Sequence, residues 1–207
     1  MTAASSTTRE HSRKVSQSLG LPFNERLPEL EPSLRLRDKS SIATRALALQ
    51  VAVACSYGYA SSEGVEWLRN HHLTSSLSEA ERAFLEDKRG DKLRFQPQVE
   101  CLFAFAWVLG LTSPLDWKSP PPENLVSLYP NLKTKESPQR FLESIRVRSE
   151  IEVLAAVDTS YCVHWGCRQV LLDGRSPPLQ VAAIENRRRA LEWSVGTENW
   201  DDLSLDT

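Results

Sequence analysis

The stretch Glu100–Gly110, with the sequence ECLFAFAWVLG, constrains the fold more than any other part of the chain. After Glu100 its side chains are apolar on every side of a helix, so that helix must be buried all round. Gln96-Pro97 comes just before it, and proline fits the first position of a helix, where an N–H would be unpaired anyway. The stretch is too short to span a bilayer, which takes about 20 residues. We predict that Pro97–Gly110 is the central helix of a globular core.

The rest of the chain also shows helical patterns. Ser78–Glu81 and Ser149–Glu152 are capping boxes, in which a serine and a glutamate three residues later each satisfy a free backbone amide at a helix start. Little of the sequence alternates with the period of two that strands require. Apolar residues recur at helical spacing in the first half of the chain, at Ile42, Ala46, Leu49 and Val53.

These patterns predict an all-α protein with a single multi-helix domain. We expect about six to eight helices within residues 10–207, the first of them near Glu10–Leu19. Residues 1–9 are small and polar and cannot bury enough apolar surface to offset ordering, so we expect disorder there.

The charge balance argues against nucleic acid as a partner. The net charge is −2, whereas proteins that bind nucleic acid usually carry a basic surplus. Basic clusters occur only locally, at Arg35–Arg37 and Arg187–Arg189, and we interpret them as solvated helix faces. Binding of nucleic acid through Arg187–Arg189 is therefore the weakest of three functional hypotheses.

Four cysteines and the first residues indicate the compartment. Residues 1–10 lack the apolar segment of a secretory signal, and no apolar run is long enough for a membrane helix. The cysteines form no dense disulfide framework, so we expect a cytoplasmic protein that does not contact a membrane. They are Cys55, Cys101, Cys162 and Cys167.

The densest group of reactive side chains is Asp158, Cys162, His164 and Cys167, all within one expected helix. Cys162 and Cys167 are five residues apart, about 140° around a helix, so one zinc ion cannot easily bind both. Cys162 and His164 also face apart and cannot form a nucleophile–base pair. We therefore predict no metal site, no cofactor and no assigned catalytic residue, and we interpret His164 as a hydrogen-bonded structural residue.

A broader set of charged residues lies in or beside the apolar helices. Buried carboxylates must be paired, and we expect Arg45 or Arg188 to pair with Glu100. The set either forms structural salt bridges between helices or lines a pocket for an anionic small molecule. Its members are Arg37, Arg45, Glu66, Glu100, Asp158, Glu185 and Arg188, and His164 joins them as a candidate binding residue.

The last nine residues, NWDDLSLDT, combine a tryptophan with three aspartates. We expect the tryptophan to fold back on the body of the protein. Trp117 and Trp200 lie in a loop and in this tail, where an exposed indole could anchor a partner. Trp200 and Asp201 are therefore candidate binding residues.

Six segments together resemble a bacterial family known as domain of unknown function 4272, over about residues 12–207. They are Arg37–Arg45 (RDKSSIATR), Glu66–Leu68 (EWL), Glu100–Gly110, Asp158–Trp165 (DTSYCVHW), Ile184–Trp193 (IENRRRALEW) and Asn199–Thr207. The resemblance implies a compact helical protein without an assigned activity. It also implies arginine and alanine at two positions where this chain has Cys162 and Gly166, so a functional site that used the arginine would be altered here.

Sequence motifs of common enzymes are missing. The chain has no glycine-rich phosphate loop, no Gly-x-Ser-x-Gly elbow and no His-Glu-x-x-His. Our first hypothesis is a protein-interaction module of adaptor, accessory or immunity type that binds a protein partner. The alternative is a small-molecule-binding protein or an enzyme that uses a buried Arg/Glu/Asp/His cluster, so enzymatic activity is left open.

Overall fold

The computed structural model describes residues 3–87 and 91–206. These residues form eight α-helices and several short 3₁₀ turns, without a strand, which confirms the all-α prediction and its expected number of helices. The helices are α1 (Ala3–Ser18), α2 (Lys39–Ser56), α3 (Ser61–Asn70), α4 (Glu79–Leu85), α5 (Val99–Val108), α6 (Gln139–Ser144), α7 (Glu150–Leu172) and α8 (Val181–Val195).

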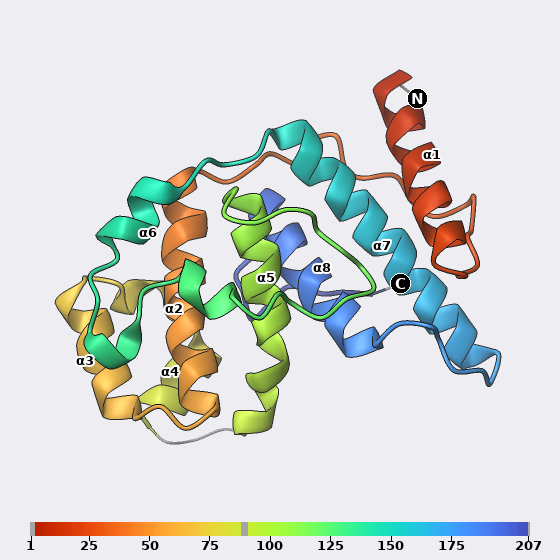
Figure 1. Ribbon diagram of the computed structural model, residues 1–207. Coiled ribbons are helices and arrows are strands. Elements are labelled where there is room, and N and C mark those ends of the chain that lie inside the picture. The colour runs from red at the N-terminus through yellow and green to blue at the C-terminus, as the bar shows by residue number, and fades with distance from the viewer. Residues whose placement is uncertain (1–2, 88–90, 207) are drawn as a thin grey trace.

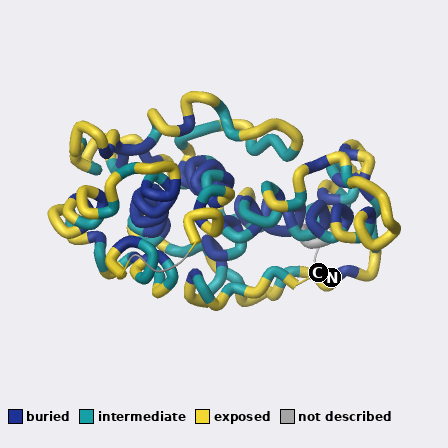
Figure 2. Tube along the Cα trace, turned by 90° about the horizontal axis from the view of Figure 1, so that it is seen from below, coloured by how far each residue is buried: buried dark blue, intermediate teal, exposed yellow. Residues whose placement is uncertain are grey.

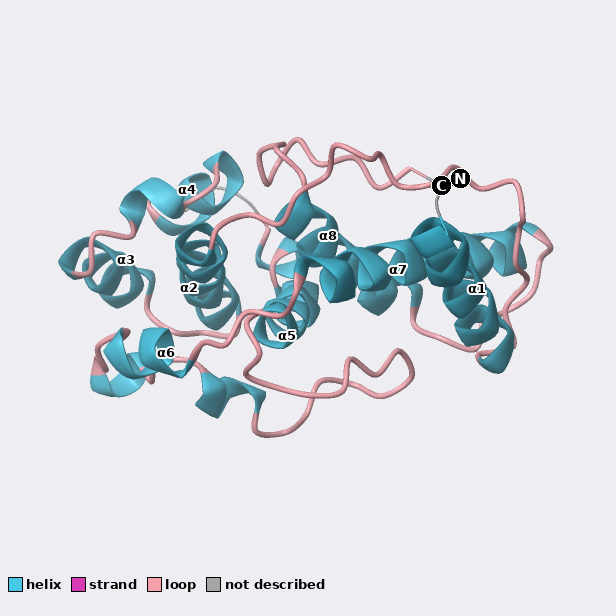
Figure 3. Cartoon of the chain, turned by 90° about the horizontal axis from the view of Figure 1, so that it is seen from above, coloured by secondary structure: helices cyan, strands magenta, loops and turns pink. Residues whose placement is uncertain are grey.

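The helices pack one against the next in a row (Figures 1 and 3). α1 lies against α7, α7 against α8, α8 against α5 and α5 against α2, and α2 also contacts α3 and α4. Figure 3 shows α5 and α8 in the middle of the row, with α1 and α3 at opposite ends. Buried residues run through the middle of the row and exposed residues lie mainly on the outer loops (Figure 2).

Helix α5 is the buried central helix that its composition predicts. Every residue in it is buried except Val99 and Trp107, which are half-buried. The helix ends at Val108, and the chain turns at Gly110, which has a φ of +70° that side-chain-bearing residues rarely adopt. A Cβ at this position would lie 1.9 Å from the carbonyl oxygen of Arg146, so only glycine allows the two segments to approach.

Both predicted capping boxes are present. Ser78 accepts a hydrogen bond from the Glu81 amide and Glu81 accepts one from the Ser78 amide, which starts α4. Ser149 and Glu152 do the same at the start of α7. Among the described helices, none combines the length and the apolar character needed to cross a membrane.

Helix α1 begins at Ala3, well before the expected start at Glu10, and so extends into the segment 1–9 for which we expected disorder. Met1 and Thr2 lie outside the described residues. Arg9 and Ser12 on α1 bond the buried carboxylate of Asp158 on α7, at 2.7 Å and 2.5 Å. These long-range bonds, which local composition cannot show, join Arg9 and Ser12 to α7.

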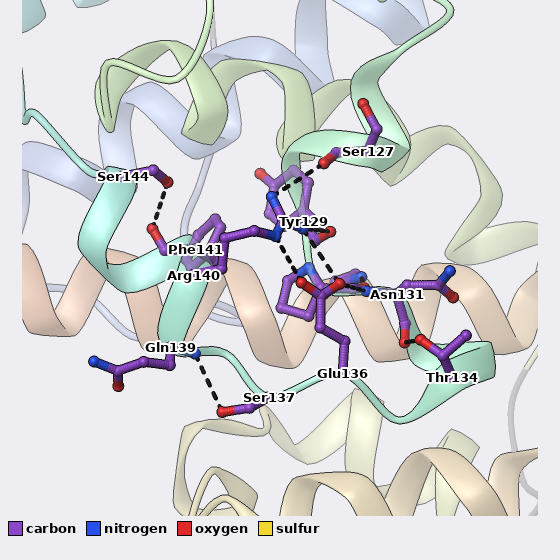
Figure 4. A network of polar contacts seen from close by, with 12 residues as sticks. Ser127, Tyr129, Asn131, Thr134, Glu136, Ser137, Gln139, Arg140, Phe141 and Ser144 are labelled. Atoms are coloured by element: carbon purple, nitrogen blue, oxygen red, sulfur yellow. Dashed lines mark hydrogen bonds and ion pairs between the residues drawn. The ribbon is translucent and has the colours of Figure 1, made fainter.

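A polar network fixes the chain between α5 and α6 (Figure 4). Arg140 pairs with Glu136 and donates to the Tyr129 carbonyl at 3.1 Å, and Glu136 accepts from the Asn131 amide at 2.7 Å. The buried Tyr129 hydroxyl donates to the Leu102 carbonyl at 2.6 Å. The network therefore holds this segment against α5, and the polar side chains named here already have hydrogen-bond partners within the protein.

Candidate binding face at the C-terminal segment

The C-terminal segment, residues 196–206, is anchored to the body by Trp200. The indole is only 5% exposed. Its ring centroid lies 5.7 Å from that of Phe105 and 6.1 Å from that of Trp193, and the Arg45 guanidinium lies 5.0 Å from it. The prediction that the tail tryptophan folds back is confirmed. The buried indole holds the segment and is not available to a partner.

Arginine side chains hold the backbone of the same segment. Arg37 donates to the Glu198 carbonyl at 2.7 Å, and Arg189 donates to that of Trp200 at 3.4 Å. Arg188 donates to the carbonyls of Leu205 and Asp206 at 3.1 Å and 3.2 Å. These arginines of the two basic clusters therefore bind the chain's own tail, and Arg187 and Arg188 are buried rather than solvated as we expected.

Asp201 joins the segment to α4. Its carboxylate accepts from the Ala80 amide at 2.9 Å and from Arg94 at 3.3 Å. The first bond satisfies a free amide in the first turn of α4, where a negative charge is favoured. Asp201 thus positions the tail beside the start of α4.

Arg45 is the buried cation at the centre of this region, with 4% of its side chain exposed. It pairs with the fully buried Glu81, and its Nη1 donates to the Ser76 carbonyl at 2.6 Å. Its Nε has no acceptor within the described part of the chain. A guanidinium has five N–H donors, and Arg45 uses two of them in these bonds.

Glu100 pairs with Arg187 at 2.7 Å, so the expected pairing with Arg45 or Arg188 is wrong. Arg187 lies three residues after Ile184 on α8 and points to the N-terminal end of α5, while Arg188 points to the opposite side, toward α7 and the tail. Arg187 also donates to the carbonyls of Asp116 and Ser119, which ties the loop after α5 to α8.

His164 lies under Arg188 and is not a poised base. Its Nδ1 accepts from Arg188 Nη1 at 2.8 Å, and because a guanidinium only donates, this nitrogen carries no proton. Burial, together with the nearby Arg188 charge, lowers the pKa of His164 to about 4. The imidazole is therefore neutral and a weak base at physiological pH.

The eight candidate residues do not meet in one pocket. Arg45, Trp200 and Asp201 line one cleft, and Arg188, in contact with His164, lines a second. The other three lie elsewhere: Asp158 is bonded to α1, Glu100 is paired with Arg187, and Glu185 is half-buried without an ion pair to any described residue.

The cysteines lack the features of nucleophiles or metal ligands. All four are free and buried. Burial raises the pKa of Cys55 and Cys167 to about 11 and that of Cys162 to about 12. Within residues 3–87 and 91–206, no group of three or more His, Cys, Asp or Glu side chains is arranged to hold a metal ion.

Two clefts flank the C-terminal segment. The first, here called the α2 cleft, has a volume of about 510 Å³ and lies between α2, residues 75–79 and residues 198–202. The second, the α7 cleft, has a volume of about 400 Å³ and lies between residues 28–34, α7, α8 and residues 203–206. Glu198 lines both. We call the segment and the two clefts together the C-terminal face.

The sequence did not single out several groups of this face. Ser75, Ser76 and Glu79 lie around the Ser78 capping box, which signals a helix start and nothing about a cleft. Glu198 was also missed, although it lies one residue before the tail motif. Only the position of the tail against α2 and α4 brings these residues together.

A family model described as Domain of unknown function (DUF4272) matches residues 8–203 of the 207 residues. No curated protein and no solved structure matches the chain.

Proposed function

The chain belongs to the DUF4272 family, whose function is unknown, and we propose that it acts as a non-catalytic protein-interaction module. The observation that supports this most is the C-terminal face, which is acidic and open. As an adaptor, accessory or immunity-type protein, it would bind a protein partner at this face. We further propose that it works in the cytoplasm, in keeping with its four free cysteines.

Charge sets the kind of partner that the face attracts. Its clefts are lined by more carboxylates than guanidinium groups, and the guanidinium groups already donate to carbonyls or carboxylates of the chain itself. A face of this sign attracts basic proteins and accelerates their encounter, whereas it repels nucleic acid. The carboxylates are Glu29, Glu31, Glu79, Glu192, Glu198, Asp201, Asp202 and Asp206, and the guanidinium groups are Arg37, Arg45 and Arg188.

The histidine beside the face and the cysteines of the protein also favour binding over catalysis. His164 is neutral and bonded to Arg188, and the buried thiols resist ionisation. Catalysis by either group would need an ionisable side chain with a pKa near the working pH and access to substrate.

A small-molecule ligand is the second candidate, and the α2 cleft favours it. The cleft has the volume of a ligand pocket, and the unused donors of Arg45 suit a ligand with hydrogen-bond acceptors. Such a ligand would raise the melting temperature of the isolated protein. A thermal-shift screen with polar small molecules tests this alternative.

Affinity capture with matched variants tests the proposal. We would tag the full chain in its native host and compare wild type with Ser75→Trp, which fills the α2 cleft, and with Ser18→Trp at the exposed end of α1. We expect one stoichiometric partner with wild type and Ser18→Trp that Ser75→Trp loses while still folded. Equal recovery with both variants would overturn the assignment of this face.

A further inference from the structure

We infer that the C-terminal face binds a basic, linear segment of the partner protein. Lysine or arginine side chains of that segment pair with Glu79, Glu198 and Asp202, while its backbone carbonyls accept hydrogen bonds from the floor of the α2 cleft. The inference rests on the proposed function and adds the chemistry of the partner.

The floor of the α2 cleft offers donors. Arg45 is buried, lines the cleft and has three N–H groups beyond its bonds to Glu81 and the Ser76 carbonyl. The hydroxyls of Ser75 and Ser76 line the same cleft and bond no described residue. The Arg45 Nε–H is buried and has no acceptor within the described residues, which is costly, whereas Ser75 is exposed and Ser76 half-buried, so that their hydroxyls add accessible donors.

The rim of the cleft determines which acceptor fits. Glu79 and Glu198 are exposed and form no ion pair with any residue in the described part of the chain. Among the described residues, Asp202 accepts only from the side-chain amide of Asn199, at 3.0 Å. These carboxylates would repel a phosphate or a free carboxylate. A peptide carbonyl is a neutral acceptor, and a basic side chain next to it would neutralise the rim.

The α7 cleft extends the same surface. Because Glu198 lines both clefts, a segment that enters both must pass this carboxylate. The α7 cleft adds apolar walls from Leu30, Leu34, Val157 and Leu203. A segment with alternating basic and apolar residues therefore matches the face better than a purely basic one.

The test uses a defined peptide and the full chain. The probe is a fluorescein-labelled peptide, acetyl-Gly-Lys-Leu-Lys-Gly-Lys-Leu-amide, and its counterpart has glutamate in place of lysine. Binding is measured by fluorescence anisotropy at low and physiological salt. The rim variant combines Glu79→Gln, Glu198→Gln and Asp202→Asn. Its matched control combines three exposed glutamates outside the face, Glu63→Gln, Glu123→Gln and Glu143→Gln, with the same change in net charge.

We expect the lysine peptide to bind the rim variant roughly tenfold more weakly than wild type, since three exposed ion pairs are lost. The control should stay within about twofold of wild type, and the glutamate peptide should not bind. In a ¹⁵N-labelled sample, the Arg45 Nε–H resonance should shift when the lysine peptide is added.

Equal affinity for the rim variant and the control would show attraction by net charge alone and would overturn the inference, as would an unchanged Arg45 resonance. The interaction proposal would still stand if Ser75→Trp loses the captured partner. The rim variant could also lose peptide binding while the capture experiment recovers no partner. That result would support the C-terminal face as a peptide-binding site and would count against the proposed role as a protein-interaction module.

Discussion

Replacing Trp200 with alanine tests whether the indole holds the C-terminal face together. The ring is 5% exposed and lies among Phe105, Trp193 and Arg45. Truncation removes roughly 150 Å² of buried apolar surface, which at about 25 cal/mol per Å² corresponds to about 4 kcal/mol of stability. Because the unfolded chain already buries part of its apolar surface, this figure is an upper estimate, and we expect a loss of stability of about 3 kcal/mol.

Urea denaturation followed by circular dichroism measures this loss. With an m value of about 2 kcal/mol per M, the midpoint should fall by about 1.5 M. Trp200→Phe keeps an aromatic ring in the site and should recover at least half of the loss. A decrease in stability below about 1 kcal/mol for Trp200→Ala would refute the idea that the indole anchors the segment.

Three further predictions concern other parts of the fold. Gly110→Ala should lower the melting temperature by about 10 °C or prevent folding, because the alanine must adopt a positive φ and its Cβ meets the Arg146 carbonyl. Scanning fluorimetry measures the melting temperature, and a decrease of less than about 2 °C would contradict this prediction. The pKa of His164 falls from 6.5 unfolded to about 4 folded, so stability should decrease as pH drops from about 6.5 to 4. The stability of His164→Asn should depend less on pH over this range. Urea denaturation at several pH values measures this, and the same pH dependence in the variant and in wild type would contradict the prediction. The buried thiols, including Cys162 and Cys167, should react with Ellman's reagent over hours when folded and within a minute in guanidinium, and fast reaction in the folded state would be incompatible with their burial.

Local patterns were enough to predict the helices. The apolar stretch Glu100–Gly110 and the capping boxes at Ser78 and Ser149 act within a few residues of the chain. Their physical causes, burial on all sides and unpaired amides at a helix start, do not depend on which helix packs on which. The tail tryptophan was predictable for the same reason, since an indole at the end of a chain gains from burial.

The choice of ion-pair partners was not predictable. Glu100 pairs with Arg187 rather than with Arg188, although the two arginines are neighbours, because a difference of one residue turns a side chain by about 100° around α8. The pair formed by Arg9 and Asp158 joins residues 149 positions apart and ties α1 to α7. Such pairings depend on the packing of whole helices, which no short pattern in the sequence contains.

Cys162 and Gly166 on α7 are the two positions at which the resemblance implied an arginine and an alanine. Cys162 lies one helical turn after Asp158 on α7, so an arginine there would be placed to pair with that carboxylate. In the structure, Asp158 pairs with Arg9. At Gly166 the Pro22 carbonyl oxygen lies 2.8 Å from where a Cβ would stand, so an alanine there would require the neighbouring chain to shift.

The most direct test of the account is hydrogen exchange of the full chain, read by mass spectrometry, with and without the captured partner. If the C-terminal face is the binding site, amides in residues 74–79 and 196–206 should gain protection, while α3 and α6 should exchange unchanged. Protection confined to α3 or α6, with residues 196–206 unaffected, would contradict the account.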